Sequence, residues 1–406
     1  MGCFFMKGIV TTAIASLALL FCTQAVAKDK LIVWEDTGKA HGIEKAIKAF
    51  ETQYNCDVEI HQSEYVEHIN DQQKALSAGK PTPDVLMLPA DRLGDAAKND
   101  FIIPLDFMEK DKARYLPSAI TSLSYNNQIY AMPRSVETLV IYYNQDLLKY
   151  PFENFDDYIK FSKEQKKEGR YGVIGKLDLF YFSYGFIGGY GAYIFKDVGN
   201  GKLDPNNLGL NNDGAVKGLE FLAKVVNTTL PKSILGNDGW GNLNKLFIEG
   251  KAAAIITGPW ELDNFAKTNL NYGVAPLGKL PNGKYFSPLL SYRAYAVSSF
   301  SKNKELAKKF LQFINQSEYA LNRYSEIHEI PPIVEIMNMP VIQNDDFANA
   351  VLTQALHATP MPTIPQMQAV WAPMDQALNE VISGKKSAKQ ALDDATSTIK
   401  NAINAQ

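Results

Sequence analysis

The sequence predicts an α/β fold, because short apolar runs alternate with amphipathic segments from residue 31 onward. Residues 31–34 (Leu-Ile-Val-Trp) and 85–88 (Val-Leu-Met-Leu) are the short apolar runs typical of buried strands, and Val58 and Ile60 indicate a strand between them. Between the first two strands the apolar residues recur at helical spacing, at Ile43, Ala46, Ile47 and Phe50. A polar, helix-like stretch follows as far as Gly79.

This order of elements predicts how the strands pair. Strand, helix, strand, helix and strand within a short segment favour parallel strands joined by helical crossovers. Ligands of such sheets bind beyond the carboxyl ends of the strands. We therefore expect Asp36–Lys39 and Asp91-Arg92, which follow the first and third strands, to lie on the same edge.

Later segments continue the α/β pattern. Residues 139–143 and 252–257 read as strands, and Gly258-Pro259-Trp260 ends the second of them. Helices are predicted around residues 216–222, over residues 304–315, and after the capping box Ser387-x-x-Gln390. The proline-rich segment 360–365 is expected to be an ordered loop.

The N-terminus predicts export from the cytoplasm. Lys7 forms a small positive region, residues 8–21 form an apolar region, and Ala25-Val26-Ala27 is typical of a cleavage site. Residues 1–27 are therefore expected to be a cleaved signal peptide that releases the chain into the periplasm. An uncleaved anchor and lipidation at Cys22 are the alternatives, although Phe21 is a poor residue to precede a lipidated cysteine.

Composition excludes some classes of function. The 406 residues carry a formal net charge of −3, which does not favour a nucleic-acid or acidic-lipid surface. Two domains are expected at this length. Of the cysteines Cys3, Cys22 and Cys56, removal of the signal peptide leaves Cys56, so neither an intrachain disulfide nor a cysteine-based metal cluster is expected. We expect Cys56 to be a buried, inert thiol.

Aromatic and charged residues near the ends of predicted elements suggest a saccharide site. Sugars present flat C–H faces to aromatic rings, and their hydroxyls need charged or polar partners. Trp240, Trp260 and Trp371 lie at such positions, although core packing is the usual place for any one tryptophan. Asp91-Arg92 could equally be a surface ion pair or a helix N-terminal turn, and Glu137 could face either solvent or a cleft.

Catalysis has little support in the sequence. The histidines show no metal-binding spacing, and no G-x-S-x-G turn occurs. Asp91 and Glu137 could be the paired carboxylates of a glycosidase, but nothing in the sequence indicates that the pKa of either is raised. No cofactor is expected.

Five segments in order along the chain resemble the family-1 extracellular solute-binding proteins, and within them the maltose/maltodextrin-binding group. They are Trp34 with the turn to Lys39, residues 83–92, residues 136–148, Thr257–Trp260, and the Met-Pro-Thr-Ile-Pro-Gln-Met block of residues 361–367 ahead of Trp371. The last block is the most specific, and the likeness covers nearly the whole chain after residue 27.

The resemblance implies a periplasmic-binding-protein type II fold, in which two α/β lobes close on a ligand about a hinge of three chain crossings. An N-terminal lobe would comprise residues 28–136 and 295–340. A C-terminal lobe would comprise residues 140–289 and 347–406. The crossings would lie near residues 136–139, 290–294 and 341–346.

The resemblance also implies which residues bind the ligand. Polar contacts would come from Lys39, Asp91, Arg92 and Glu137, and stacking would come from Tyr181, Trp240, Trp260 and Trp371. Several positions depart from the maltose-binding pattern. Leu88 stands in place of a tryptophan, Asp375 in place of an arginine, and Trp240 in place of a tyrosine. Leu179 and Gly38 each stand in place of an acid, although Asp178 is next to Leu179 and Asp36 could reach the space beside Gly38. The resemblance alone therefore leaves the exact sugar open.

The function that the resemblance implies is capture of a maltose- or maltodextrin-like oligosaccharide and its delivery, by a monomer, to the membrane subunits of an ABC importer. Two alternatives remain. One is a binding protein of the same fold for a different sugar or a non-sugar solute, and the other is a periplasmic carbohydrate-active enzyme.

Overall fold

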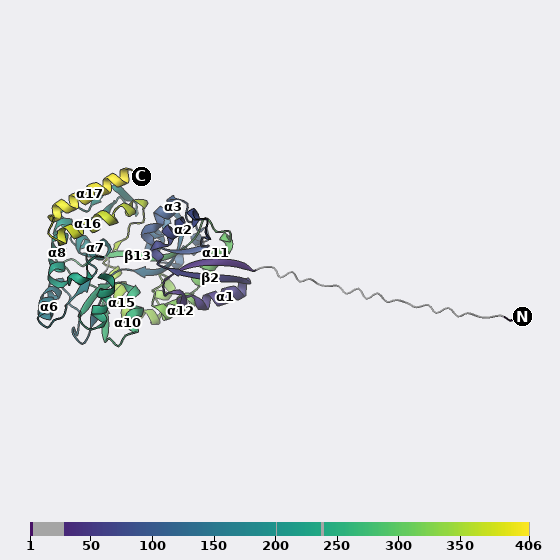
Figure 1. The fold of residues 1–406 in the computed structure, drawn as a ribbon, viewed down its shortest axis with the longest axis horizontal. Coiled ribbons are helices and arrows are strands. Elements are labelled where there is room, and N and C mark those ends of the chain that lie inside the picture. Colours follow the sequence, from purple (N-terminus) through teal and green to yellow (C-terminus); the bar gives the residue numbers. More distant parts are fainter. Residues whose placement is uncertain (3–27, 200, 237–238, 406) are drawn as a thin grey trace.

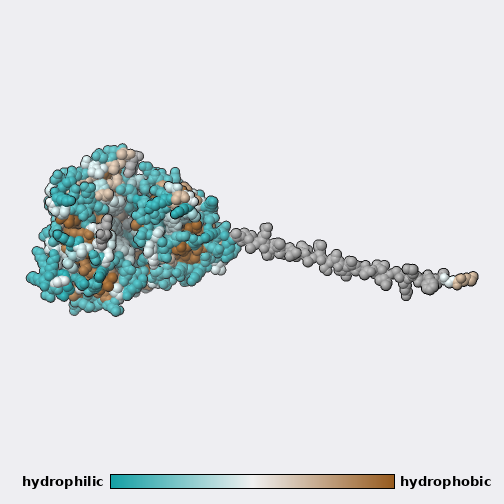
Figure 2. All heavy atoms as spheres, viewed as in Figure 1, coloured by the Kyte–Doolittle hydropathy of each residue, from teal (hydrophilic) through white to brown (hydrophobic). Residues whose placement is uncertain are grey.

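The computed structural model describes residues 1–2, 28–199, 201–236 and 239–405. The predicted signal peptide and Cys22 lie outside these described residues. Helices and strands form two groups with the long strand β13 (Leu289–Val297) between them (Figure 1). Among the described residues, no helix has the length and apolarity needed to cross a membrane. The face drawn in Figure 2 is mostly hydrophilic, with separate hydrophobic areas on both groups.

The first sheet has the order β14-β13-β3-β1-β2, and β6 also pairs with β13. Its strands are β1 (Asp29–Asp36), β2 (Cys56–Ser63), β3 (Val85–Pro89), β6 (Ala131–Glu137), β13 and β14 (Thr359–Pro360). Strand β1 runs parallel to β2 and β3, as the strand–helix alternation predicts. Strand β13 runs antiparallel to β3 and β6.

The second sheet has the order β12-β7-β11-β8. Its strands are β12 (Tyr272–Ala275), β7 (Val140–Asn144), β11 (Ala254–Thr257) and β8 (Ile174–Gly175). Strand β7 is antiparallel to both neighbours, whereas β11 and β8 are parallel, so this sheet is mixed. Two short hairpins complete the strands, β4 (Ser124–Tyr125) with β5 (Gln128–Ile129) and β9 (Tyr193–Asp197) with β10 (Leu203–Gly209).

Helices cover each sheet. The first group contains α1 (Glu44–Tyr54), α2 (His68–Ser77), α3 (Leu93–Lys98), α4 (Met108–Asp111), α5 (Pro117–Ser122), α11 (Lys304–Ile314), α12 (Ser317–Ile327), α13 (Val334–Met337) and α14 (Pro340–Gln343). The second contains α6 (Phe155–Lys167), α7 (Phe180–Gly189), α8 (Asp213–Thr229), α9 (Trp240–Ile248), α10 (Leu262–Ala266), α15 (Asp346–Ala355), α16 (Trp371–Ile382) and α17 (Ala388–Asn404). Short 3-10 turns that matter below are η2 (Tyr65–Glu67), η3 (Ala90–Arg92), η7 (Pro259–Glu261) and η8 (Pro365–Ala369).

Local sequence explains these elements. Val85–Leu88 are all fully buried because β3 is a central strand of the first sheet. Helix α1 buries its apolar face at Ile47 and Phe50, and it ends at Asn55, which adopts the left-handed conformation (φ 49°) that asparagine tolerates. Cys56 is buried and opens β2, so the strand starts earlier than Val58.

The C-terminal helix begins as its capping box predicts. The side chain of Ser387 accepts a hydrogen bond from the Gln390 amide, and the helix buries Leu392 and Ile399. Figure 1 shows α16 and α17 beside α7 and α8 in the second group.

The chain passes between the two sheets at the positions that frame the site. Strands β6 and β7 belong to different sheets, and Thr138 and Leu139 join them. Strand β12 of the second sheet precedes β13 of the first, and α14 is followed by α15, which packs against β12. The lobe boundaries and the hinge action of these segments stay predictions.

Candidate functional site

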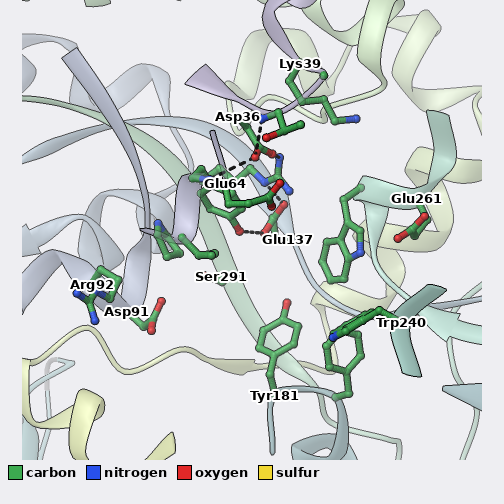
Figure 3. A pocket seen from close by; sticks show the side chains of 18 of the residues that line it. Asp36, Lys39, Glu64, Asp91, Arg92, Glu137, Tyr181, Trp240, Glu261 and Ser291 are labelled. Carbon is green, nitrogen blue, oxygen red and sulfur yellow. Dashed lines mark hydrogen bonds and ion pairs between the residues drawn. The ribbon is translucent and has the colours of Figure 1, made fainter. Parts of the chain in front are cut away.

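A cavity of about 700 Å³ lies between the two groups of elements, within the usual range for small-molecule sites. All nine residues predicted to bind ligand line it: Asp36, Lys39, Asp91, Arg92, Glu137, Tyr181, Trp240, Trp260 and Trp371. Figure 3 shows Asp91 and Arg92 on one side of it, Trp240 and Glu261 on the other, and Glu137 between them. Their roles in binding stay predictions.

The expected edge of the first sheet supplies the polar side of the cavity. Asp36 ends β1, Lys39 follows it, and Asp91 and Arg92 lie on η3 directly after β3. Because β1 and β3 are parallel, their carboxyl ends meet here.

Arg293 on β13 organises the centre of this side. Its guanidinium donates to Asp36 at 2.8 Å, pairs with Glu137, and lies over the Tyr65 ring at 4.3 Å from the centroid. The Tyr65 hydroxyl donates to the other oxygen of Glu137 at 3.2 Å. Both carboxylate oxygens of Glu137 are therefore engaged by protein groups. Burial raises the pKa of Glu137 above its ordinary value, although Arg293 opposes this shift.

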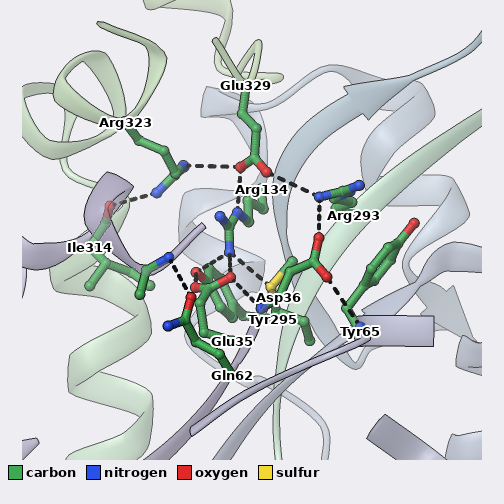
Figure 4. Close-up of polar contacts among 12 residues, drawn as sticks. Glu35, Asp36, Gln62, Tyr65, Arg134, Arg293, Tyr295, Ile314, Arg323 and Glu329 are labelled. Atoms are coloured by element: carbon green, nitrogen blue, oxygen red, sulfur yellow. Dashed lines mark hydrogen bonds and ion pairs between the residues drawn. The ribbon is translucent and has the colours of Figure 1, made fainter. Parts of the chain in front are cut away.

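A buried network continues behind Arg293 (Figure 4). Glu329 contacts Arg293 at 3.3 Å and Arg134 at 2.5 Å. Arg134 also bonds Glu35 and Tyr295. Burial alone would raise the pKa of Glu329, but the neighbouring guanidinium groups hold it at about 2. The network therefore keeps the carboxylate of Glu329 ionised and fixes the strands that carry the cavity's polar residues.

Asp91 is held from the opposite group. Its Oδ2 accepts a hydrogen bond from Trp371 Nε1 at 3.1 Å and another from Gln368 Nε2 at 3.3 Å. Arg92 donates to Gln368 at 2.8 Å and to Asn70 at 2.8 Å. Asp91 and Arg92 do not form the ion pair with each other that the sequence left open. Burial raises the pKa of Asp91.

Gly94 allows this contact to form. A Cβ atom at Gly94 would lie 2.2 Å from the carbonyl oxygen of Thr363, and the Gly94 amide donates to that oxygen at 3.0 Å. The proline-rich segment is therefore an ordered loop, as predicted, and it carries Gln368 and Trp371 to the η3 turn.

Lys39 meets the second group directly. Its ammonium lies 3.1 Å from Asp263 Oδ2 on α10, and His328 Nδ1 lies 3.3 Å from Asp263 Oδ1. Burial would raise the pKa of Asp263, but Lys39 and His328 bring it below its ordinary value.

Aromatic rings form the opposite wall. Tyr181 and Trp260 have ring centroids 6.2 Å apart, and Phe182 lies 5.3 Å from Trp240 and 6.1 Å from Trp260. Gly258 permits the Trp260 conformation, since a Cβ there would lie 2.0 Å from the indole ring. The hydroxyl of Tyr181 points toward the middle of the cavity (Figure 3).

Some of the positions that depart from the maltose-binding pattern have structural roles. Leu88 is buried within β3, and Asp178 pairs with the buried Lys176 at 3.0 Å. Asp375 accepts a hydrogen bond from the Phe180 amide at 2.6 Å, and burial raises its pKa. Leu88, Asp178, Leu179 and Asp375 do not line the cavity, whereas Gly38 does. Among the described residues, no cluster of His, Cys, Asp and Glu side chains could hold a metal ion.

Several further residues line the cavity and are not predicted by the sequence patterns: Glu64, Tyr65, Glu261, Asp263, Asn264, Ser291, Arg293 and Gln368. Some of them carried a signal. Arg293 is a charge within a nine-residue strand that is otherwise mostly apolar, and Glu261 and Asp263 directly follow the Gly-Pro-Trp turn. Tyr65 and Glu64 lie in a polar turn without a distinctive motif.

Comparisons with known proteins identify the family to which the chain is similar. The family model of the bacterial extracellular solute-binding proteins matches residues 45–349. A galactooligosaccharide-binding protein of Bacillus subtilis is 37% identical, over 93% of this chain and 90% of the relative. A maltooligosaccharide ABC transporter solute-binding lipoprotein of Streptococcus pneumoniae is 32% identical, over 97% of this chain and 96% of the relative.

Solved structures are similar over the same extent. MalX of Streptococcus pneumoniae in complex with maltopentaose has a TM-score of 0.84 and 32% identity, covering 92% of this chain and all of that one (100%). The maltose-binding periplasmic protein MalE of Listeria monocytogenes in complex with maltose has a TM-score of 0.79 and 31% identity, covering 93% and 99% of the two chains.

Proposed function

The chain belongs to the family of bacterial extracellular solute-binding proteins and has the periplasmic-binding-protein type II fold, and from this we propose that it captures a neutral oligosaccharide of the maltodextrin class in the cavity between its two lobes. The bound sugar is then delivered to the membrane subunits of an ABC importer. Names of relatives support this class, since they include maltooligosaccharide and galactooligosaccharide binders.

One observation carries the proposal. The cavity places an aromatic wall of Tyr181, Trp240 and Trp260 opposite the polar side at Asp91 and Arg293. A pyranose ring needs both kinds of surface, because its C–H faces stack on aromatic rings while its hydroxyls require polar partners. The residues on the two sides of the cavity belong to different sheets. A ligand that contacts both sides at once therefore favours the arrangement in which the lobes are close.

Binding without turnover fits the carboxylates better than glycoside hydrolysis. A glycosidase requires an acid and a second carboxylate free to meet the scissile bond. Arg293 and Tyr65 occupy the two oxygens of Glu137, and Trp371 and Gln368 donate to Asp91. These contacts support roles in holding a ligand and its cleft in place.

The protein acts outside the cytoplasm, as its family does. We propose that cleavage after Ala27 releases it into the periplasm, with lipidation at Cys22 as the alternative because relatives from Streptococcus pneumoniae are lipoproteins. Mass spectrometry of the protein exported from a producing cell distinguishes a chain that starts at Lys28 from one that starts at a diacylated Cys22.

Isothermal titration calorimetry of residues 28–406 tests the binding proposal. The ligands are maltose to maltohexaose, galactooligosaccharides of matched length and a neutral oligosaccharide with a different backbone. We expect one site with micromolar or tighter affinity for a glucan or galactan, and no new product on chromatography after prolonged incubation. Hydrolysis that Glu137→Gln abolishes would instead support the enzyme, and heat exchange with none of these sugars would contradict the proposal.

A further inference from the structure

The carboxylate of Glu261, on the cavity wall, differs from most of the neighbouring carboxylates in its polar partners. Asp36, Glu137 and Asp263 each pair with an arginine or lysine. Glu261, which is only 8% exposed, has no Lys, Arg or His within 4.0 Å among the described residues, the distance that defines an ion pair. A buried carboxylate is costly unless hydrogen bonds compensate it.

Two amide side chains provide part of that compensation. Asn244 Nδ2 donates to Glu261 Oε2 at 2.9 Å, and Asn264 Nδ2 donates to the same oxygen at 2.8 Å. The other oxygen, Oε1, accepts no hydrogen bond from the described residues. One half of the carboxylate is thus fixed by the protein, and the other half is available on a wall of the cavity.

The two amides also define where this free oxygen lies. Asn244 is one turn after Trp240 on α9, and Glu261 directly follows Trp260 on η7. Figure 3 shows Glu261 and Trp240 on the same side of the cavity. A sugar unit stacked at either ring would bring its equatorial hydroxyls toward Glu261, since those hydroxyls lie at the edge of the pyranose ring.

Building on the proposed function, we propose that Glu261 is a specificity-determining ligand contact. Its Oε1 accepts a hydrogen bond from a hydroxyl of the sugar unit next to Trp240 and Trp260, and its charge rejects oligosaccharides that carry a carboxylate on that unit. Glu64, an exposed acid that also lines the cavity, adds to the negative potential there. Lys267, an exposed cation of the same lining, opposes it.

The test uses residues 28–406 with Glu261→Gln, Glu261→Asp and the control Glu220→Gln, whose glutamate is exposed on α8. Calorimetry is run with maltotetraose and with maltotetraose oxidised to a carboxylate at the reducing end or at C6 of the non-reducing end. Galactotetraose and its oxidised forms replace these if the wild type prefers galactans. Thermal unfolding of each variant confirms that the fold is retained.

We expect Glu261→Gln to bind the neutral tetrasaccharide about tenfold more weakly, since a hydrogen bond to a charged carboxylate is replaced by one to a neutral amide. The same variant should discriminate at least tenfold less against one oxidised form. Glu261→Asp should weaken neutral binding yet keep the discrimination, and Glu220→Gln should match the wild type.

Unchanged affinity and unchanged discrimination in Glu261→Gln, with a wild type that binds tetrasaccharide, would overturn the role of Glu261 and leave the proposed function intact. A wild type that binds no neutral tetrasaccharide would overturn the proposed function, and the inference with it.

Discussion

Lys39 and Asp263 form an ion pair across the cavity, with the lysine nitrogen 3.1 Å from Oδ2 of the aspartate. Lys39 follows β1 of the first sheet, and Asp263 lies on α10 beyond β11 of the second. Their side chains are 10% and 11% exposed, so solvent screens the pair less than it would a surface pair. This contact therefore favours the arrangement in which the two sides of the cavity are close.

Replacement of Asp263 by asparagine should shift the protein toward a more open form. Loss of a largely buried pair of this kind is expected to cost the closed form about 1–2 kcal/mol, which corresponds to a roughly five- to thirtyfold weaker affinity. Small-angle X-ray scattering without ligand should show a larger radius of gyration, and Asp213→Asn, at an exposed position on α8, is the charge-matched control. An unchanged radius and affinity would show that the pair does not hold the lobes together.

The tryptophans at the ends of elements should each contribute to affinity. Trp260→Ala and Trp371→Ala are expected to weaken oligosaccharide binding at least tenfold, because a stacked aromatic contributes roughly 1–3 kcal/mol. Trp371→Phe keeps a ring but loses the N–H that donates to Asp91, so its affinity should fall between those of the wild type and Trp371→Ala. Calorimetry measures all three variants, and full affinity in both alanine variants would mean that the ligand binds elsewhere.

Lys176 should stabilise the fold around Asp178 and Ile234. Its ammonium, 1% exposed, pairs with Asp178 and donates to the Ile234 carbonyl at 3.0 Å, and it lies 5.9 Å from the Trp240 ring centroid. Lys176→Met leaves the carboxylate of Asp178 buried without its cation, which should lower the free energy of unfolding by about 3–5 kcal/mol. Urea unfolding followed by circular dichroism measures this. The exposed pair at Lys160 and Asp157 offers a control, Lys160→Met, with a loss below about 1 kcal/mol.

The buried network predicts a specific loss of stability in acid. The pKa of Glu329 is about 2 in the folded protein, below the value of roughly 4.3 expected for an unfolded chain. Its contribution, about 3 kcal/mol, is therefore complete above pH 5 and is lost as the pH falls toward 2, because the unfolded chain takes up the proton first. Burial raises the pKa of Glu137 and Asp91, so protonation of these two groups favours the folded state and offsets part of the loss.

Urea unfolding of the wild type and Glu329→Gln between pH 7 and pH 3 isolates this contribution. The variant should be less stable at pH 7, and the difference between the two proteins should shrink as the pH falls. If the variant does not fold, the wild type alone should still lose stability below pH 5. A constant difference across the range would contradict the low pKa of Glu329.

The sequence was sufficient to predict the positions of residues that directly follow a recognisable strand. Asp36, Asp91 and Trp260 follow short apolar strands, so parallel pairing and the turn residues together predict where they lie. The match of a whole family pattern added Tyr181 and gave a ligand-binding role to Glu137, whose local context left both solvent and a cleft open. All of them line the same cavity.

Contacts between distant segments could not be predicted in this way. Arg293 bonds Asp36 across 257 residues, and Gln368 bonds Asp91 across 277 residues, so each pairing depends on the complete fold. The sequence shows that a charge occurs within β13, but its partners, Asp36 at the end of β1 and Glu137 on β6, follow from the assembled sheet. The ion pair between Lys39 and Asp263 likewise joins distant segments and depends on the complete fold.

Hydrogen–deuterium exchange with and without maltotetraose, or with the tetrasaccharide that calorimetry shows to bind most tightly, tests the central claim most directly. A ligand held between the lobes should slow amide exchange on both sides of the cavity, in residues 36–39 and 89–92 and in residues 181–182 and 260–264. The outer helices α6 and α11 should exchange at the same rate in both samples. Protection restricted to one side, or its absence at saturating ligand, would contradict capture by closure of the lobes.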